Sequence, residues 1–350
     1  MKENITISEM TSIKQAMKLL NKTGENCLLV VDENKKLLGT VTDGDLRRSI
    51  LKGVNYHSTI QESYNQNPFV LESDKFSDKE AGEIMTRNKV DLLPILDSKE
   101  KIMDYITWEQ LFGKNSKKSG QVLKVPVVIM AGGRGTRMEP FTKVLPKPLV
   151  PIHEKPIIEH IIERFTELGC SDFYITVNYK GKILKAYFED LNLDYKVHFL
   201  DENEPLGTAG SLRLLDGQFN QPFFVTNCDI IIKADYNNLY EFHRKGGYDI
   251  TLVASAKEYV IPYGTCELNG DGHLSHINEK PKYDFLINTG LYILNPDLLS
   301  IIPKNKFYHI THMIENLKNA GKRIGVFPID DEAWVDIGQW AEYKQAVNKL

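Results

Sequence analysis

The sequence predicts an α/β protein in which a doubly wound, mostly parallel sheet is preceded by a tandem of small α+β domains. Three observations support this class. After residue 122, apolar runs typical of buried strands alternate with amphipathic helical patterns, an order that favours a parallel sheet covered by helices. Before residue 113, a helix–strand–strand–helix pattern occurs twice. The polar stretch Gly113–Gln121 separates the halves, and we interpret it as a linker.

The first half divides into two copies, 1–60 and 61–113, and 114–121 is the linker before the last domain, 122–350. Neither copy has an apolar face large enough to fold alone, so we expect the two to pack against each other. The predicted elements of the first copy are Ile13–Leu20 (helix), Cys27–Val31 and Leu38–Val41 (strands) and Asp43–Leu51 (helix). Those of the second copy are Ser77–Arg87, Leu92–Leu96, Ile102–Ile106 and Trp108–Phe112.

The first copy ends in Gly39–Ser49, GTVTDGDLRRS, which resembles the signature of a CBS domain, and the repeat resembles a CBS tandem. In that family, clefts between copies often bind adenine nucleotides. The resemblance implies that the Thr42 hydroxyl meets a phosphate and that the Asp45 carboxylate bridges both ribose hydroxyls. The alternative is that Thr42 and Asp45 cap the following helix. In the second copy Gln110 stands in place of the aspartate, so that copy departs from the pattern.

Seven strands and one clear helix can be placed in the last domain. The helix is Ile157–Leu168, whose apolar residues recur on one face before Gly169 ends it. The strands are Val125–Met130, Phe173–Val177, Val197–Leu200, Phe223–Thr226, Ile250–Ala254, Asn288–Leu294 and Ile324–Ile329. Ligands of such sheets bind at the carboxyl ends of the strands.

The first of these strands leads into a glycine-rich loop, Ala131–Arg137. Three glycines in four positions let backbone N–H groups approach an anion closely, so the loop predicts a phosphate-binding nest. It is not a P-loop, which ends in Gly-Lys-Ser/Thr, because Gly135 is followed by Thr136. It is not a dinucleotide-binding fingerprint either, because the position of the next glycine holds Met138.

The longer run Ala131–Ile152, AGGRGTRMEPFTKVLPKPLVPI, resembles the signature of nucleotidyltransferases that join a nucleoside triphosphate to a sugar 1-phosphate. In their reaction a sugar phosphate oxygen attacks the α-phosphorus and pyrophosphate leaves, so two polyanions must be aligned and neutralised. The resemblance implies that Arg137 grips the triphosphate with its planar fork and that Lys147 supplies a point charge at the phosphates. The alternative for both is a solvated surface role.

The same resemblance assigns further residues. Asp229, which closes the run after the predicted strand Phe223–Thr226, and Asp336, in the run Trp334–Gly338, would bind Mg²⁺, which takes one or two carboxylates together with phosphate oxygens and water. The nucleotide would lie against Ala131, Gly132, Gly133, Gly135, Thr136, Glu204, Gly207 and Thr208. The sugar phosphate would lie against Gly264, Glu279, Lys280 and Asn288. The alternatives are turn formation for the aspartates and a solvated turn for Glu279–Lys280.

Composition limits the remaining possibilities. The net charge of −4 over 350 residues provides no basic field, so we expect neither nucleic acid nor a membrane surface as a partner. Four scattered cysteines predict neither a zinc site nor a disulfide framework, and we expect reduced, packed thiols. A polar N-terminus without an apolar core predicts a cytoplasmic protein. CBS tandems commonly pair face to face, so the resemblance implies a homodimer.

The combination of a CBS tandem and a nucleotidyltransferase domain resembles the CBS-linked nucleotidyltransferases of bacterial legionaminic acid pathways. That family makes GDP-glucosamine from GTP and glucosamine 1-phosphate, and those substrates are what the resemblance implies. The run Glu204–Gly210 also resembles the base loop of guanylyltransferases that act on mannose 1-phosphate. Two alternatives stay open at this point: a transferase that uses UTP or CTP, and an inactive protein that only senses nucleotides.

Overall fold

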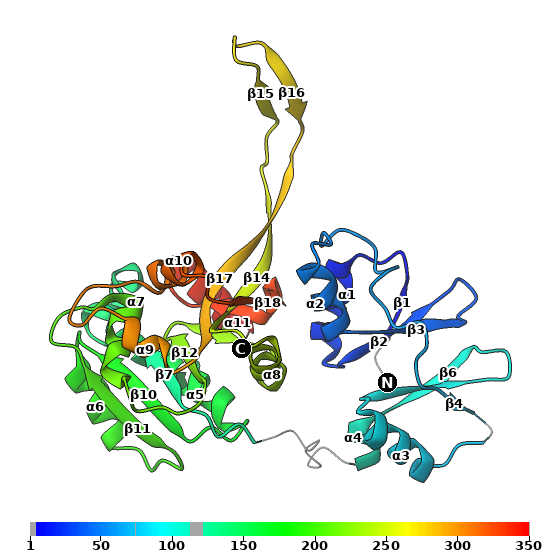
Figure 1. Ribbon diagram of the computed structural model, residues 1–350, viewed down its shortest axis with the longest axis horizontal. Helices are drawn as coiled ribbons and strands as arrows, with labels where there is room; N and C mark the ends of the chain where they lie inside the picture. The colour runs from blue at the N-terminus through cyan, green and yellow to red at the C-terminus, as the bar shows by residue number, and fades with distance from the viewer. Residues whose placement is uncertain (1–4, 74, 113–121, 350) are drawn as a thin grey trace. The chain divides into compact units, whose positions relative to one another are not determined.

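Figure 1 shows the computed structural model, which describes residues 5–73, 75–112 and 122–349 and divides into two compact units, Met1–Gly120 and Gln121–Leu350. The stretch Gly113–Gln121, interpreted above as a linker, lies outside the described residues. Among the helices that are described, none combines the length and apolar character that a membrane span requires.

The first unit contains two copies of one fold. The first copy comprises β1 (Thr6–Ser8), α1 (Ile13–Thr23), β2 (Cys27–Val31), β3 (Leu37–Thr42) and α2 (Asp43–Leu51). The second comprises β4 (Leu71–Glu72), α3 (Asp78–Asn88), β5 (Leu92–Leu96), β6 (Ile102–Thr107) and α4 (Trp108–Phe112). In each copy a short first strand runs parallel to the second, which forms an antiparallel hairpin with the third.

The hairpins of both copies are closed by the same turn. Asp32 Oδ1 accepts hydrogen bonds from two following backbone N–H groups at 2.8 and 2.9 Å, and Asp97 Oδ1 accepts two at 2.8 Å each. An aspartate that bonds to its own backbone in this way fixes the turn locally. A bridge between Lys36 and Lys101 joins the two hairpin tips.

The second unit is built on a seven-stranded sheet with the order β11-β10-β7-β12-β17-β14-β18. Of these strands only β17 runs antiparallel to its neighbours, so the prediction of a mostly parallel sheet is confirmed. The strands are β7 (Val127–Met130), β10 (Asp172–Val177), β11 (Lys196–Asp201), β12 (Phe223–Asn227), β14 (Ile250–Val260), β17 (Lys282–Leu294) and β18 (Ile324–Asp330).

Helices cover both faces of this sheet. They are α5 (Ile157–Thr166), α6 (Gly181–Glu189), α7 (Gly207–Gly210), α8 (Tyr236–Gly246), α9 (Leu298–Ile301), α10 (Ile310–Asn319) and α11 (Trp340–Lys349). Short elements connect them: η1 (Thr136–Met138), η2 (Phe141–Lys143), η3 (Lys147–Leu149), β8 (Pro151–Ile152), β9 (Lys155–Pro156), η4 (Ser211–Leu215), β13 (Ile230–Ile232), η5 (Asp331–Ala333) and β19 (Trp334–Asp336).

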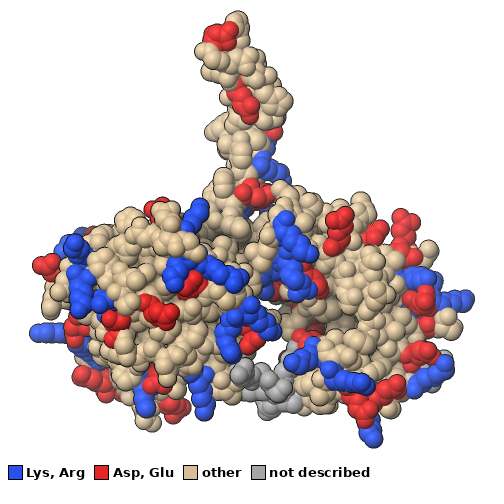
Figure 2. Space-filling model, in the orientation of Figure 1, with Lys and Arg blue, Asp and Glu red and all other residues tan. Residues whose placement is uncertain are grey.

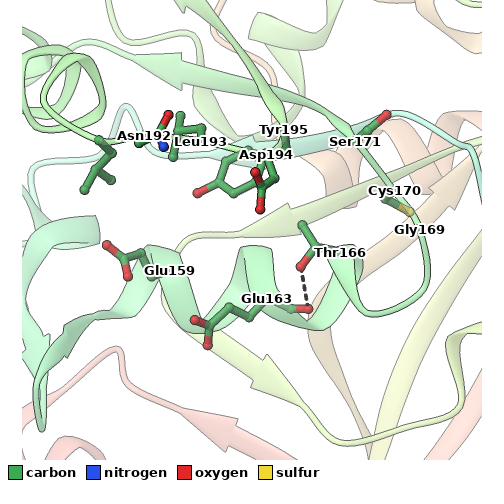
Figure 3. A pocket seen from close by; sticks show the side chains of 11 residues that line it. Glu159, Glu163, Thr166, Gly169, Cys170, Ser171, Asn192, Leu193, Asp194 and Tyr195 are labelled. Atoms are coloured by element: carbon green, nitrogen blue, oxygen red, sulfur yellow. Dashed lines mark hydrogen bonds between the residues drawn. The ribbon is translucent and has the colours of Figure 1, made fainter. Parts of the chain in front are cut away.

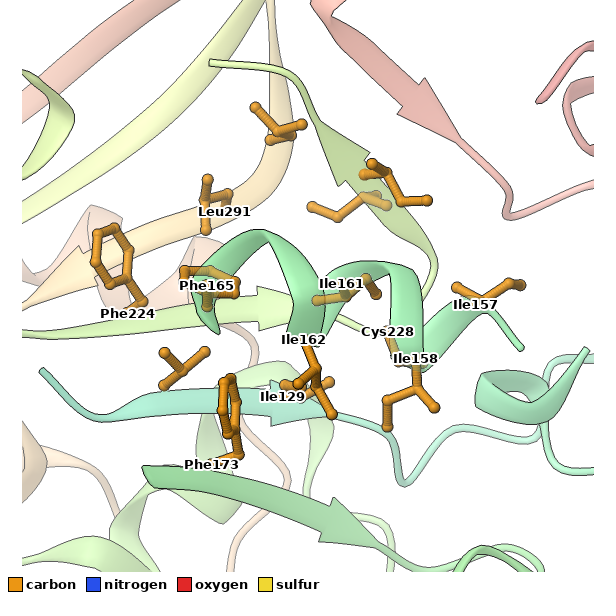
Figure 4. Packing of buried hydrophobic residues seen from close by; sticks show 14 of the residues in the cluster. Ile129, Ile157, Ile158, Ile161, Ile162, Phe165, Phe173, Phe224, Cys228 and Leu291 are labelled. Carbon is orange, nitrogen blue, oxygen red and sulfur yellow. The ribbon is translucent and has the colours of Figure 1, made fainter. Parts of the chain in front are cut away.

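Two apolar cores lie on opposite faces of the sheet. Successive side chains of a strand point to opposite faces, so Ile129 of β7 joins the core under α5 and Val128 joins the core under α7, α9 and α10. Figure 4 shows how α5 packs, with Ile158, Ile162 and Phe165 directed at the central strands. This packing holds the carboxyl ends of β7 and β12 at one rigid edge.

The strands β14 and β17 continue beyond the sheet as a long two-stranded arm, which we define as residues 257–285 (Figure 1). A smaller hairpin of β15 (Thr265–Leu268) and β16 (Leu274–Asn278) ends the arm. The sequence predicts much shorter strands because these residues lack a sustained buried pattern. The expectation of packed thiols is wrong for Cys266, which lies on the arm and is exposed, whereas the other three cysteines are buried.

Candidate functional site

The glycine loop follows β7 at the carboxyl edge of the sheet and is fixed by two hydrogen bonds. The Ala131 N–H donates to Thr176 Oγ1 on the neighbouring strand β10 at 3.1 Å. The Thr142 hydroxyl donates to the Gly135 carbonyl at 2.9 Å. Gly135 has a φ of 67°, and a Cβ at this position would lie 2.9 Å from Thr142 Cγ2. Any other residue would be strained there, so the loop requires glycine.

Between these anchors the loop is open to solvent. Gly133, Thr136 and Arg137 are exposed, and Gly132 and Gly135 are half-buried. A Cβ at Gly133 would meet no atom within 4 Å. The backbone of the loop can therefore be approached closely by an anion, as the sequence predicts.

The two predicted metal-binding aspartates come from neighbouring strands. β13 and β19 pair antiparallel with Ile230 opposite Asp336, which brings the residue before β13, Asp229, beside it. The N–H of Ile337 donates to the Asp229 carbonyl at 2.8 Å. The ammonium of Lys147, in η3, forms an ion pair with Asp229 Oδ2.

Gly338 marks the centre of this group. A Cβ at Gly338 would lie 2.9 Å from Asp336 Oδ1, 3.3 Å from Asp229 Oδ2 and 3.7 Å from Arg137 Nη2. Arg137, Lys147, Asp229 and Asp336 therefore surround one small space beside the glycine loop. Sequence segments separated by some 200 positions are brought together at this edge of the sheet. The family resemblance implies such a meeting, because it assigns these residues to one site.

The electrostatics of the group suit a divalent cation. Burial raises the pKa of Asp336, the Gly338 N–H at 2.7 Å opposes that shift, and nearby Asp229 adds to it. The side chain of Lys147 is 9% exposed and gives the two carboxylates one buried positive partner. Mg²⁺ prefers carboxylate and phosphate oxygens, so Asp229 and Asp336 fit as its protein ligands.

Replacing Gly338 by alanine tests this geometry. The new Cβ would force the two carboxylates apart, so we expect the Mg²⁺ concentration needed for half-maximal activity to rise by about 10- to 100-fold. The matched control is Gly270→Ala, whose Cβ would meet no atom within 4 Å. Equal Mg²⁺ titrations for the two variants would show that Gly338 does not border the metal site.

Glu202 is a candidate residue that the sequence reasoning missed. It follows β11 and is buried, and its Oε1 would lie 2.8 Å from a Cβ on Gly132. Burial raises the pKa of Glu202, and the Leu206 N–H donates to its Oε2 at 3.1 Å. The predicted residue Glu204 is exposed instead. The signal for Glu202 is its place directly after β11, the edge strand next to β10.

The loop before α7 packs against the chain's own backbone. A Cβ at Gly207, whose φ is 77°, would lie 2.8 Å from the Tyr308 carbonyl oxygen. A Cβ at Gly210 would lie 2.7 Å from the Lys306 carbonyl oxygen. Thr208 Oγ1 accepts from the Ile310 N–H at 3.0 Å, at the start of α10. These glycines therefore allow the backbone of the segment before α10 to pack closely against the loop. Their contact with a nucleotide stays a prediction.

Three of the four predicted sugar-phosphate residues lie on the arm. A Cβ on Gly264 would lie 3.1 Å from Glu279 Oε2, so these two face each other across the arm, with Lys280 next in sequence. Asn288 lies at the base of the arm, where its Nδ2 donates to the Tyr292 hydroxyl at 2.8 Å. The structure thus brings Asn288 to the sheet edge and carries the other three outward.

A scan against family models matches the nucleotidyl transferase family over residues 126–350. The match covers more than half of the chain. The chain belongs to the nucleotidyl transferase family.

Relatives of this nucleotidyl transferase carry more specific names. It is 36% identical over 222 residues to mannose-1-phosphate guanyltransferase 2 of Candida glabrata, covering 61% of each chain. It is 40% identical over 188 residues to mannose-1-phosphate guanyltransferase of Aspergillus fumigatus, covering 50% of each. Its longer matches to curated relatives span about three fifths of the length of those relatives.

A solved structure adds a further likeness. The crystal structure of HddC from Yersinia pseudotuberculosis complexed with GMP-PN matches with a TM-score of 0.50 and 28% identity, covering 64% of this chain and 99% of that one. The likeness in fold therefore extends over nearly the whole of that structure.

The first unit of the nucleotidyl transferase matches the CBS domain over residues 1–52. A cavity of about 350 Å³ in this unit is lined by Thr42 and Asp45 and by Lys89–Leu92 of the second copy. Asp45 also accepts from the Thr42 N–H at 2.9 Å, which completes a capping box at the start of α2. Both roles weighed for this pair, capping and lining a cleft, are thus geometrically compatible.

A second cavity, of about 610 Å³, lies between α5 and the segment Leu191–Tyr195 (Figure 3). Glu159, Glu163 and Asp194 give its lining an acidic character, and none of the described residues that line it is Lys or Arg. A polyphosphate would be repelled there. The sheet edge with Arg137 is therefore the better candidate for nucleotide chemistry.

Proposed function

We propose that the chain transfers a guanylyl group from GTP to a sugar 1-phosphate and releases pyrophosphate. The observation that carries the proposal is the meeting of Arg137, Lys147, Asp229 and Asp336 around Gly338, beside the glycine loop. A protein that only binds nucleotides has no need for two cations and two carboxylates at one point. The family match supports the reaction class.

The chemistry requires little covalent participation by the protein. An oxygen of the sugar phosphate forms a bond to the α-phosphorus of GTP, and the bond from that phosphorus to the bridging oxygen breaks, leaving its electron pair on pyrophosphate. Arg137 binds the β- and γ-phosphates through its fork and follows the charge that develops on the leaving group. Lys147, which forms an ion pair with Asp229, would supply positive charge to the reacting phosphates.

A Mg²⁺ ion held by Asp229 and Asp336 would neutralise charge on the triphosphate. The backbone N–H groups of the glycine loop hold the triphosphate in register. The bound nucleotide covers the reacting groups and excludes water from them. We expect most of the rate enhancement to come from this alignment of two polyanions.

Guanine is the base that the chain's own residues and relatives favour. The carboxylate of Glu202 lies beside Gly132 and can accept hydrogen bonds from the adjacent N1–H and N2–H donors of guanine, a pair that adenine and uracil lack. The names of the relatives point the same way. For the sugar we propose glucosamine 1-phosphate, from the resemblance to the CBS-linked family, with mannose 1-phosphate as the competing substrate.

A thermal-shift panel of GTP, ATP, UTP and CTP with Mg²⁺ tests the choice of nucleotide. At a concentration 100 times its Kd, the preferred nucleotide should add about 2.7 kcal/mol to the free energy of unfolding. We expect GTP to give the largest shift. A larger shift with UTP or CTP would reassign the base, and a shift confined to adenine nucleotides would favour the sensor alternative.

We also propose that the cavity of the first unit binds an adenine nucleotide that modulates the enzyme. Replacing Asp45 by alanine should abolish the response to added AMP or ATP and leave basal activity intact, because Asp45 lines that cavity. Couplings of this kind typically amount to about 5- to 150-fold in affinity. The measurement is a GTP titration with and without AMP and ATP.

The second copy offers a matched control. Gln110 makes the same cap at the start of α4, accepting from the Thr107 N–H at 2.9 Å, but does not line the cavity. Gln110→Ala should therefore keep the nucleotide response while losing a comparable cap. A wild-type enzyme that ignores both nucleotides, with none bound outside the active site by calorimetry, would contradict the regulatory role.

A further inference from the structure

The last helix of the second unit begins close to the proposed metal site. Asp336 ends β19, and the N–H of Ile337 donates to the Asp229 carbonyl at 2.8 Å. Gly338 borders both carboxylates, and α11 starts two residues later at Trp340. A short connection therefore joins α11 to the two aspartates.

Two aromatic side chains of α11 bind residues 139–151, the segment that runs from the end of η1 into β8. The Trp340 Nε1–H donates to the Glu139 carbonyl at 2.6 Å. The Tyr343 hydroxyl donates to the Pro151 carbonyl at 2.7 Å. One helix thus holds the backbone of this segment at both of its ends.

A ring contact supports the same arrangement. The ring centroid of Phe141 lies 5.0 Å from that of Trp340 and 6.1 Å from that of Tyr343, and we call these three residues the aromatic clamp. Phe141 opens η2, which is closed locally by the hydrogen bond from the Val144 N–H to the Phe141 carbonyl at 2.9 Å. A single turn of this kind has little stability of its own, so its position depends on such tertiary contacts.

Lys147 lies between the two ends that α11 holds. It opens η3, which ends at Leu149, two residues before Pro151. Its ammonium forms the ion pair with Asp229, and 9% of its side chain is exposed. A lysine is a point charge on a flexible stem, so its place at the phosphates depends on the backbone that carries it. A misplacement of about 1 Å can lower the rate of an enzyme about 100-fold.

Surface charge does not replace this positioning. Figure 2 shows Lys and Arg side chains interspersed with Asp and Glu over the visible face of the second unit, and the whole chain has a net charge of −4. Charges of mixed sign largely cancel at a distance, so such a surface provides no basic field that gathers two polyanions. Their alignment then depends on individual cations that are held in place.

We propose that Trp340 and Tyr343 are positioning residues for the transfer reaction. They fix residues 139–151 to α11 and thereby set Lys147 relative to the two carboxylates. One part of the site carries Asp336 and continues into α11, another part carries the lysine, and the aromatic clamp joins the two. This inference rests on the charge-supplying role proposed above for Lys147.

Single substitutions remove one part of the aromatic clamp at a time. Trp340→Phe keeps a ring against Phe141 but loses the N–H donor, and Tyr343→Phe loses only the hydroxyl. We expect each to lower kcat by about 3- to 10-fold, as the loss of one hydrogen bond does. Trp340→Ala should lower kcat by about 10- to 100-fold. The matched control is Trp108→Phe in the first unit, where the ring of Trp108 packs on that of Phe112 at 4.3 Å, and it should leave kcat unchanged.

A double-mutant cycle with Lys147→Gln separates positioning from a general structural effect. If Trp340 acts through Lys147, Trp340→Phe should change kcat by less than about 2-fold in a chain that already carries Lys147→Gln. Slow variants are measured in single turnovers with enzyme in excess, and thermal unfolding is recorded for each. Effects that multiply in full, as they would if Trp340→Phe only reduced the folded fraction, overturn the proposal.

The outcomes also separate this inference from the proposed function. If Lys147→Gln alone keeps the wild-type kcat, the charge-supplying role of Lys147 is wrong, and the aromatic clamp loses its basis. If Lys147→Gln lowers kcat while Trp340→Phe and Tyr343→Phe both match the wild type, the role of Lys147 stands and only the positioning role is wrong.

Discussion

Replacing Arg137 by alanine is expected to lower kcat by about 10²- to 10⁵-fold, the range found when a transition-state charge clamp is removed. Arg137 is the last residue of the glycine loop, lies within η1, and is beside both aspartates across Gly338. We propose that its guanidinium stabilises charge on the departing pyrophosphate. The measurement is steady-state pyrophosphate release at saturating nucleotide and sugar 1-phosphate.

Two further variants sharpen this prediction. Arg137→Lys keeps the charge but loses the planar fork, so we expect a rate between those of alanine and arginine. Arg134→Ala removes an exposed arginine from the same loop and should change kcat far less. Equal losses in Arg134→Ala and Arg137→Ala would mean that the loop needs general positive charge and that Arg137 has no special position.

Replacing Asp336 by asparagine should raise the Mg²⁺ requirement strongly and lower the rate at any fixed Mg²⁺ concentration. In the wild-type protein the Gly338 N–H donates a hydrogen bond to Asp336 Oδ1 at 2.7 Å. Asparagine keeps an Oδ1 that can accept this bond, so we expect the fold around the site to be preserved. What is lost is one carboxylate charge of the two proposed to hold the ion. The measurement is activity against Mg²⁺ concentration, with thermal unfolding recorded in parallel.

Asp190→Asn is the control, because it removes an exposed carboxylate at the end of α6, away from the sheet edge. Its Mg²⁺ titration should overlay that of the wild type. If Asp336→Asn also overlays the wild type, the ion is held elsewhere. If Asp336→Asn unfolds at a clearly lower temperature, the aspartate has a structural role that the hydrogen bonds do not explain.

The residues predicted for the central site meet at one sheet edge, and their roles there stay a prediction. The glycine loop could be read from the buried strand before it, and Gly135 has the backbone conformation that glycine adopts most easily. Asp229 and Asp336 came from the family resemblance. The alternation of strands and helices likewise indicated the mostly parallel sheet.

The sequence could not reveal the arm or the antiparallel direction of β17. Both depend on which strands pair over long separations, which the local sequence pattern does not specify. Glu202 was missed for a related reason. The glycines of the following loop give the stronger local signal, but they allow contact with the backbone of Lys306–Tyr308, a tertiary approach that no local pattern encodes.

The most direct test of the proposed reaction is product formation from purified protein, GTP, Mg²⁺ and one sugar 1-phosphate at a time, glucosamine 1-phosphate and mannose 1-phosphate included. Pyrophosphate release is followed with a coupled pyrophosphatase, and the nucleotide product is identified by its mass. The account predicts release that requires both substrates, together with a GDP-sugar in equal amount. Protein that binds GTP but releases no pyrophosphate with any sugar 1-phosphate and any of the four nucleoside triphosphates would contradict it.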